Sequence, residues 1–264
     1  MKKLIVLLIL CSSTAIFAQK TYKKSLQGIK TVRIESDVDI TVVSGNTSEL
    51  ILTEQKEKHE NHFPSFGNDK KKKDRKKGLK AVFAGGTDNT DGLGFSVTKE
   101  GTVLIVRDLK SHMQREDIKV TLPKSMNINI DSGNLGDIVI DGFTGEVEAD
   151  SNVGEITLKN VTGPVTAHTS TGTISVVFTK VNQSAPISIS SSVGEIDVSL
   201  PANTKANLDL RTNGTVYTNF DFKAPPKKGL PNRSGMKNIT SPINGGGVKI
   251  KLKSSMGNIY LRKG

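Results

Sequence analysis

Residues 135–178 decide the fold, and they read LGDIVIDGFTGEVEADSNVGEITLKNVTGPVTAHTSTGTISVVF. A glycine recurs in this stretch every nine residues, at Gly136, Gly145, Gly154, Gly163 and Gly172. Each glycine precedes a short segment in which apolar and polar residues alternate, as Glu155-Ile156-Thr157-Leu158 does. Alternation with a period of two is typical of a strand with one buried face, and a glycine before each strand predicts a tight bend with a positive φ. Short repeats of fixed length predict a solenoid of stacked turns.

The repeat continues more loosely to the end of the chain. Ser192–Val198 repeats Asn152–Leu158 almost position for position, and Gly194, Gly214 and Gly257 each open a further repeat. The strand candidates before Pro123 are irregular, and we expect them to cap the open end of the stack. The sequence therefore predicts an all-β fold, a single-stranded β-solenoid or β-helix-like stack with an irregular N-terminal cap, forming one domain over residues 19–264.

The alternation also predicts which side chains face the core. The inward positions are small or β-branched, as a narrow stack requires. They are Val147, Ala149, Ile156, Leu158, Val165, Ala167, Ile174, Val176, Ile187, Ile189, Ile196, Val198, Leu208, Leu210, Ile259 and Leu261.

Residues 1–18 have the pattern of a secretory signal peptide, with Lys2 and Lys3 before an apolar run and Ala18 at the expected cleavage site. Cys11 raises the alternative of a lipid anchor, but Leu10 before it is not small, so we favour cleavage near Ala18. The remaining chain has no cysteine and no apolar run long enough to cross a membrane. We therefore expect an exported protein in the periplasm, at the cell surface or secreted.

Two long loops are expected within the domain. Residues 55–80 are rich in lysine, and such a block cannot bury apolar area. The second loop, residues 223–247, is rich in proline and glycine. The first contains the candidates for binding a polyanion, which are Lys70, Lys71, Lys72, Lys73, Arg75, Lys76 and Lys77.

The charge itself has two interpretations. Without Lys2 and Lys3 the net charge falls from +11 to +9, and this excess either attracts anionic partners or serves solubility. We do not expect nucleic acid as a partner, because the basic segment lacks interleaved aromatic residues.

Asp137 and Glu155 are weak metal-ligand candidates. If two nine-residue strands form one turn of the solenoid, their side chains lie about 4.8 Å apart in one column. Solvated surface carboxylates are the default interpretation, and we expect no cofactor.

No motif for nucleophilic catalysis or phosphate binding follows residue 18. There is no Gly-x-Ser-x-Gly turn, no phosphate-binding loop and no cysteine. A polysaccharide lyase or hydrolase on a β-helix scaffold stays open as an alternative, because such sites are assembled in space. A third alternative is a structural spacer without a ligand.

The repeats, the Ile118–Pro123 strand and the closing segment Gly246–Leu261 resemble a bacterial family. These are exported cell-envelope domains of unknown function labelled "putative adhesins", which are related to head-GIN domains. The resemblance covers residues 29–263 and implies an exported β-solenoid with no established activity. We therefore expect a non-enzymatic adhesin or structural module of the envelope that binds glycan or an envelope protein.

Overall fold

The computed structural model describes residues 20–55, 78–79, 81–110, 117–221 and 235–264. The described residues form twenty strands in two ten-stranded sheets, and they contain no helix. The all-β prediction is therefore confirmed.

In spatial order sheet A contains β1 (Thr21–Ser25), β4 (Glu49–Gln55), β7 (Asp117–Pro123), β3 (Ile40–Gly45), β9 (Ile138–Asp141), β11 (Ile156–Val161), β13 (Ile174–Phe178), β15 (Ile196–Leu200), β20 (Ile259–Lys263) and β17 (Val216–Thr218). Sheet B contains β18 (Lys237–Ile243), β16 (Ala206–Thr212), β19 (Val248–Met256), β14 (Ile187–Val193), β12 (Val165–Thr171), β10 (Val147–Val153), β8 (Asn127–Asp131), β2 (Thr31–Glu35), β6 (Val103–Asp108) and β5 (Phe95–Glu100).

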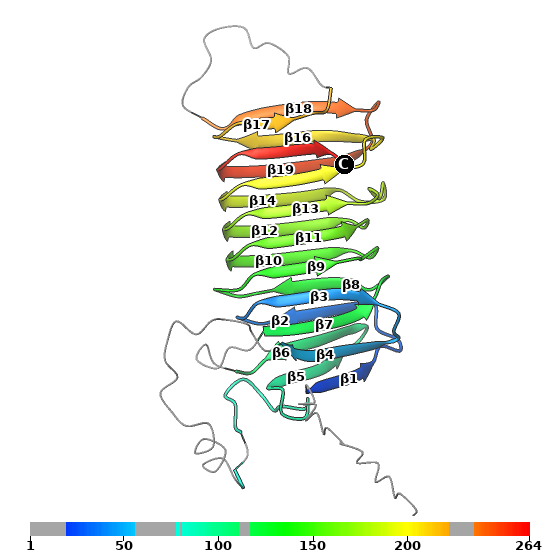
Figure 1. Ribbon diagram of the computed structural model, residues 1–264, viewed down its shortest axis with the longest axis vertical. Helices are drawn as coiled ribbons and strands as arrows, with labels where there is room; N and C mark the ends of the chain where they lie inside the picture. The colour runs from blue at the N-terminus through cyan, green and yellow to red at the C-terminus, as the bar shows by residue number, and fades with distance from the viewer. Residues whose placement is uncertain (1–19, 56–77, 80, 111–116, 222–234) are drawn as a thin grey trace, which may run out of the picture.

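One turn of the solenoid consists of one strand from each sheet. Ile138 pairs with Ile156, and Ile156 pairs with Ile174, so equivalent positions lie eighteen residues apart in the central turns. The strands within each sheet run parallel there, and Figure 1 shows them as a regular stack. Two nine-residue segments per turn explain why glycine recurs with a period of nine.

The core lies between the two sheets. Successive side chains of a strand point to opposite faces, so each strand contributes every second residue to the core. All sixteen inward positions predicted from the alternation are buried, each with no more than 3% of its surface exposed. Leucine, isoleucine and valine dominate, because the space between the sheets is narrow.

The repeated glycines lie where one strand of a turn passes into the next. A Cβ atom at Gly154 would approach the carbonyl oxygen of Gly136 to less than 3.0 Å, and one at Gly172 would approach that of Gly154 as closely. Gly163 has the same relation to Gly145 at the other corner. Adjacent turns thus bring backbone against backbone, and only glycine leaves room for this contact.

The predicted reason for these glycines was wrong for most of them. Of the eight turn glycines, only Gly172 and Gly194 have a positive φ, at 152° and 151°. The other six do not have a positive φ. Their requirement is steric and comes from the stacked neighbour rather than from the bend itself.

A ladder of buried hydroxyl groups accompanies one column of glycines. Thr169 Oγ1 donates to the carbonyl oxygen of Gly154 at 3.1 Å, and Ser191 Oγ donates to that of Gly172 at 3.0 Å. The same contact recurs in other turns. Its donors are Ser132, Ser151, Thr169, Ser191, Ser254 and Thr212. Each hydroxyl satisfies a corner carbonyl that would otherwise lose its hydrogen bond to water.

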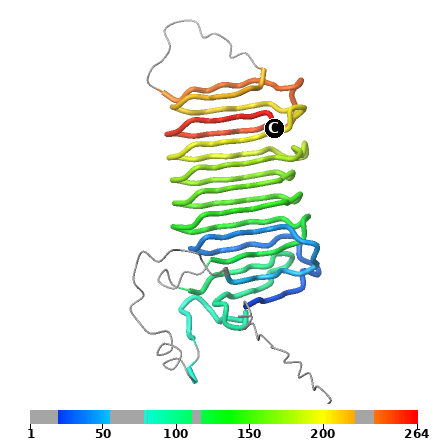
Figure 2. The backbone as a smooth tube through the Cα atoms, in the orientation of Figure 1, coloured from blue at the N-terminus to red at the C-terminus, as the bar shows by residue number. Residues whose placement is uncertain are grey.

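The chain does not follow the stack from end to end. Strands β19 and β20, the last in sequence, lie between the β14–β15 turn and the β16–β17 turn. Strands β2 and β3, near the start, lie between the β6–β7 and β8–β9 turns in the same way. Figure 2 shows the red C-terminal segment flanked by yellow segments.

Antiparallel strands cover both ends of the stack. At the N-terminal end, β4 pairs antiparallel with β7 and β5 with β6, which confirms the irregular N-terminal cap. At the other end, β18 pairs antiparallel with β16 in sheet B, while β17 is the edge strand of sheet A among the described strands. These strands cover edges that would otherwise offer unpaired backbone groups to other chains.

Two loop predictions are affected by these elements. The expected loop over 223–247 is wrong in part, because Lys237–Ile243 forms β18. Of the expected loop over 55–80, Gln55 ends β4, and residues 56–77 and residue 80 lie outside the described residues. Residues 1–18, the predicted signal peptide, also lie outside them.

Candidate functional site

Two tyrosines lie side by side on the outer face of sheet A. In β20 the inward residues Ile259 and Leu261 are buried, so Tyr260 and Arg262 project outward. Strand β17 pairs with β20 so that Tyr217 lies opposite Tyr260. Strand register therefore brings together two aromatic rings that are 43 positions apart in sequence.

The two rings form a stacked pair. Their centroids lie 5.2 Å apart and their planes differ by 12°. Tyr217 is 51% exposed, and the guanidinium carbon of Arg262 lies 5.4 Å from the centre of the Tyr260 ring. We call this surface, made of Tyr217, Tyr260, Asn219, Asp197 and Arg262, the tyrosine platform.

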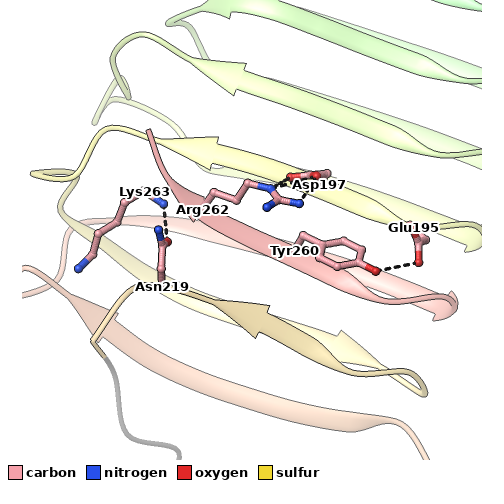
Figure 3. Close-up of polar contacts among 6 residues, drawn as sticks. All are labelled: Glu195, Asp197, Asn219, Tyr260, Arg262 and Lys263. Atoms are coloured by element: carbon pink, nitrogen blue, oxygen red, sulfur yellow. Dashed lines mark hydrogen bonds and ion pairs between the residues drawn. The ribbon is translucent and has the colours of Figure 1, made fainter.

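Polar side chains lie near the Tyr260 ring (Figure 3). Arg262 donates from Nε to Asp197 Oδ1 and from Nη2 to Asp197 Oδ2, both at 2.8 Å. This hydrogen bonding raises the pKa of Arg262, which therefore stays charged. The Tyr260 hydroxyl donates to Glu195 Oε1 at 3.1 Å. The Asn219 side-chain oxygen accepts from the backbone N–H of Lys263 at 2.7 Å.

A shallow pocket of about 480 Å³ lies over this surface, and its lining consists of Tyr217, Thr218, Asn219, Tyr260, Leu261, Arg262 and Lys263. A pocket of this volume lies within the range of small-ligand sites, and aromatic walls with a few polar groups are typical of them. The donors and acceptors are held in place by one another, so a ligand would meet an ordered surface. The arrangement can bind a flat, partly apolar molecule with hydroxyl groups at its edge.

The predicted metal candidates are neighbours in the structure. Asp137 and Glu155 occupy equivalent positions in adjacent turns, just before the paired residues Ile138 and Ile156. The Asp137 carboxylate accepts the backbone N–H of Glu155 at 2.7 Å, and Asp39 accepts that of Asp137 at 2.8 Å. This column of side chains thus ties one turn to the next. Within the described ranges no group of three or more histidine, aspartate or glutamate residues could hold a metal ion.

The polyanion candidates Lys70 to Lys77 lie outside the described residues. Among the described residues, no helix is long and apolar enough to span a membrane.

A mixed acidic and basic pocket lies near the N-terminal end of sheet B, with a volume of about 250 Å³. Burial raises the pKa of its Asp108. That carboxylate accepts from Ser36 Oγ at 3.0 Å and from the backbone N–H of Lys110 at 2.9 Å. Two further carboxylates of the pocket, Asp37 and Asp131, each accept a backbone N–H from the neighbouring loop. These acids are therefore engaged in ordering the loops around them.

The tyrosine platform was not predicted from the sequence. The available signal was scarcity, because the chain has no tryptophan and only three tyrosines. Tyr260 falls on an outward position of a recognised repeat, where an aromatic side chain is not needed for packing. The position of Tyr217 next to Tyr260 could not be predicted, because β17 pairs with β20, a strand that follows it by about 40 residues in the sequence.

The sequence and the fold of this chain were compared with those of known proteins. No curated protein is recognisably similar in sequence. Among solved structures, a putative cell adhesion protein from Clostridium sporogenes is 13% identical, with 94% of this chain and 100% of that chain covered and a TM-score of 0.45. A putative adhesin from Bacteroides fragilis is 14% identical, with 93% and 97% covered and a TM-score of 0.35. The family profile described as Toastrack DUF4097 matches residues 33–262. This match spans most of the chain and confirms the predicted resemblance, and the chain belongs to the Toastrack DUF4097 family, a domain of unknown function.

Proposed function

We propose that this chain is an exported, non-catalytic binding protein of the cell envelope whose tyrosine platform binds a neutral glycan. The observation that carries the proposal is the stacked, exposed pair of Tyr217 and Tyr260 in a chain with so few aromatic residues. Aromatic side chains on an outer sheet face contribute nothing to the core. Tyrosine and arginine, together with tryptophan, are enriched among the residues that carry most of the binding energy at protein interfaces.

The chemistry of the platform fits a pyranose. The C–H face of a sugar ring is apolar and can pack on an aromatic ring, while its hydroxyl groups need donors and acceptors at the edge. Asn219, Asp197 and Arg262 supply such groups around the rings. Tyrosine loses little conformational entropy on binding, because it has only two side-chain torsions.

Two further observations support binding without catalysis. The carboxylates of the acidic pocket are occupied by hydrogen bonds to the protein, as described for Asp108. The residues after 18 offer no nucleophile motif. Export rests on the sequence pattern of residues 1–18, and cleavage after Ala18 is testable by N-terminal sequencing of the exported protein.

The test is a glycan-array screen of the purified protein followed by calorimetry with the best neutral oligosaccharide. We expect Tyr217→Ala and Tyr260→Ala each to weaken binding by about tenfold or more, since each removes an aromatic surface worth roughly 1.4 kcal/mol or more. Val177→Ala is the matched control, because Val177 is an exposed apolar residue on the same sheet face.

Three outcomes would contradict the proposal. They are no glycan bound by the wild-type protein, equal loss in the Val177→Ala control, and release of reducing or unsaturated sugar ends during incubation. The last of these would instead favour the polysaccharide-acting enzyme. Tyr260→Phe separates stacking from hydrogen bonding, because it keeps the ring and removes the contacts of the hydroxyl group with Glu195 and Asn258.

A further inference from the structure

A third pocket lies on the outer face of sheet B, on the side of the solenoid opposite the tyrosine platform. Its volume is about 190 Å³, which suits one small charged group rather than a whole ligand. The lining consists mainly of hydroxyl groups and cations. Its residues are His168, Ser188, Ile189, Ser190, Ser191, Ser192, Lys251, Lys253 and Ser255.

Strand register assembles this pocket from three neighbouring strands. Ser190 of β14 pairs with His168 of β12 on one side and with Lys253 of β19 on the other. Ser188 pairs with Lys251 in the same way. Neighbouring strands lie about 4.8 Å apart, so these outward side chains form a compact two-dimensional array.

Neither lysine forms a salt bridge in the part of the chain that the structure describes. Its ion pairs involve other residues, and none is formed by Lys251 or Lys253. The acid in register with Lys251 is Asp209, whose two oxygens accept from Arg211 at 2.8 and 2.9 Å. The hydrogen bonds from Arg211 and the charges of Arg211, Lys249 and Lys251 lower the pKa of Asp209, so Lys251 shares this carboxylate at longer range with two other cations. Both lysine residues are half-buried.

A histidine orients one of the serines. His168 Nδ1 lies 3.0 Å from Ser190 Oγ. When Nδ1 carries the proton and donates it to Ser190 Oγ, the serine hydroxyl hydrogen is available to a ligand. Asp150 lies beside His168 on β10, and burial raises the pKa of this carboxyl group.

We propose that this pocket binds a tetrahedral oxyanion, the sulfate or phosphate ester group of a ligand. The lysines supply charge, and Ser188, Ser190, Ser192 and Ser255 supply hydroxyl donors on adjacent strands. Hydrogen bonds to an ionised acceptor are about twice as strong as those between neutral groups. A group with three free oxygens can use donors from several strands at once, whereas a planar carboxylate has only two.

The aspartate, histidine and serine of this array do not make it a hydrolytic site. Among the described hydrogen bonds none joins Asp150 to His168, which a triad needs to orient the imidazole. The backbone amides around Ser190 pair with neighbouring strands in the ladder, so they are not available as an oxyanion hole. Binding is the role that the geometry supports.

The test uses small probes, because a polyanion would also be attracted by the lysine-rich segment. The probes are glucose 6-sulfate, glucose 6-phosphate, glucuronate and glucose, titrated at constant ionic strength and followed by amide chemical shifts. We expect at least one ester to shift amides of β12, β14 and β19 and to bind about tenfold or more tightly than glucuronate or glucose. Comparison of the two esters identifies the source of the oxyanion.

Variants then assign the binding to the pocket. Lys251→Ala/Lys253→Ala is expected to weaken ester binding by about tenfold or more, and Ser190→Ala by several-fold. Lys119→Ala/Lys159→Ala is the matched control, because it removes the same charge from the outer face of sheet A.

The proposal is overturned if neither ester shifts the pocket amides, if glucuronate binds as tightly, or if the control double variant weakens binding equally. If the Lys251→Ala/Lys253→Ala protein does not fold, the chemical shift changes of the wild-type protein and the affinity of Ser190→Ala still show whether the ester binds in this pocket. Tyr217→Ala should leave ester binding unchanged, so this site and the tyrosine platform can fail independently.

Discussion

At each glycine corner the backbone of one turn lies directly against the carbonyl group of the turn beside it. Gly154 illustrates this contact, since even one methyl group would collide with the carbonyl of Gly136. The nine-residue period predicted that a small residue is needed at these positions. Spacing alone could not separate a positive φ from a close backbone contact, because both exclude a side chain.

We expect Gly154→Ala to lower the free energy of unfolding by about 1–3 kcal/mol or more, because the stacked backbone has to shift to accept the methyl group. Thr157→Val, an outward position on the next strand, should stay within about 0.5 kcal/mol. Denaturant unfolding of both variants measures the difference. Equal midpoints would show that the corner can open at no cost.

At the scale of the element, strand β12 has Thr169 on its inner face and Thr166 on its outer face. Thr169 is fully buried and donates to the Gly154 carbonyl at 3.1 Å, whereas Thr166 is exposed. We expect Thr169→Val to cost about 1–3 kcal/mol, because it keeps the shape and leaves a buried acceptor without its donor. Thr166→Val on the same strand is the control and should be nearly neutral. Chemical denaturation of both proteins is the measurement, and indistinguishable stabilities would mean that the hydroxyl ladder does not contribute.

Elements differ in how well the sequence predicted them. For the strands of the central turns, the sequence predicted both the strand and its buried face. The reason is that the glycine spacing and the alternation of apolar and polar residues repeat from residue 135 to residue 178. Strand β18 was not, since its alternation is weak and Pro242 lies within it. Proline is compatible with an edge strand, where one side of the backbone has no partner to pair with. The tyrosine platform and the oxyanion pocket both depend on the register of such late strands, which is why neither could be located from the sequence.

At the scale of the whole molecule, the order of turns in space differs from their order in the chain. The last seventeen residues, 248–264, supply β19 and β20, which lie inside the stack rather than at its end. Strand β19 is the shared neighbour of β14 and β16, and β20 is that of β15 and β17. The pairing of β16 and β17 with the rest of the solenoid therefore passes through residues 248–264, and it can form only once these residues are available. This sequence separation is expected to slow folding, because loop closure precedes the contacts that stabilise it.

We expect a chain ending at residue 247 to lose amide exchange protection in β16 and β18, while β10 and β12 keep theirs, because the former pair with the core only through the missing turn. Adding a synthetic peptide of residues 248–264 should restore protection, since it supplies the shared neighbour. A peptide carrying Ile250→Asn and Ile259→Asn is the control, because both isoleucines are fully buried in the native turn. Undiminished protection of β16 in the truncated chain would mean that β16 can pair directly with β14, and that the inserted turn is dispensable for joining the two parts of the stack.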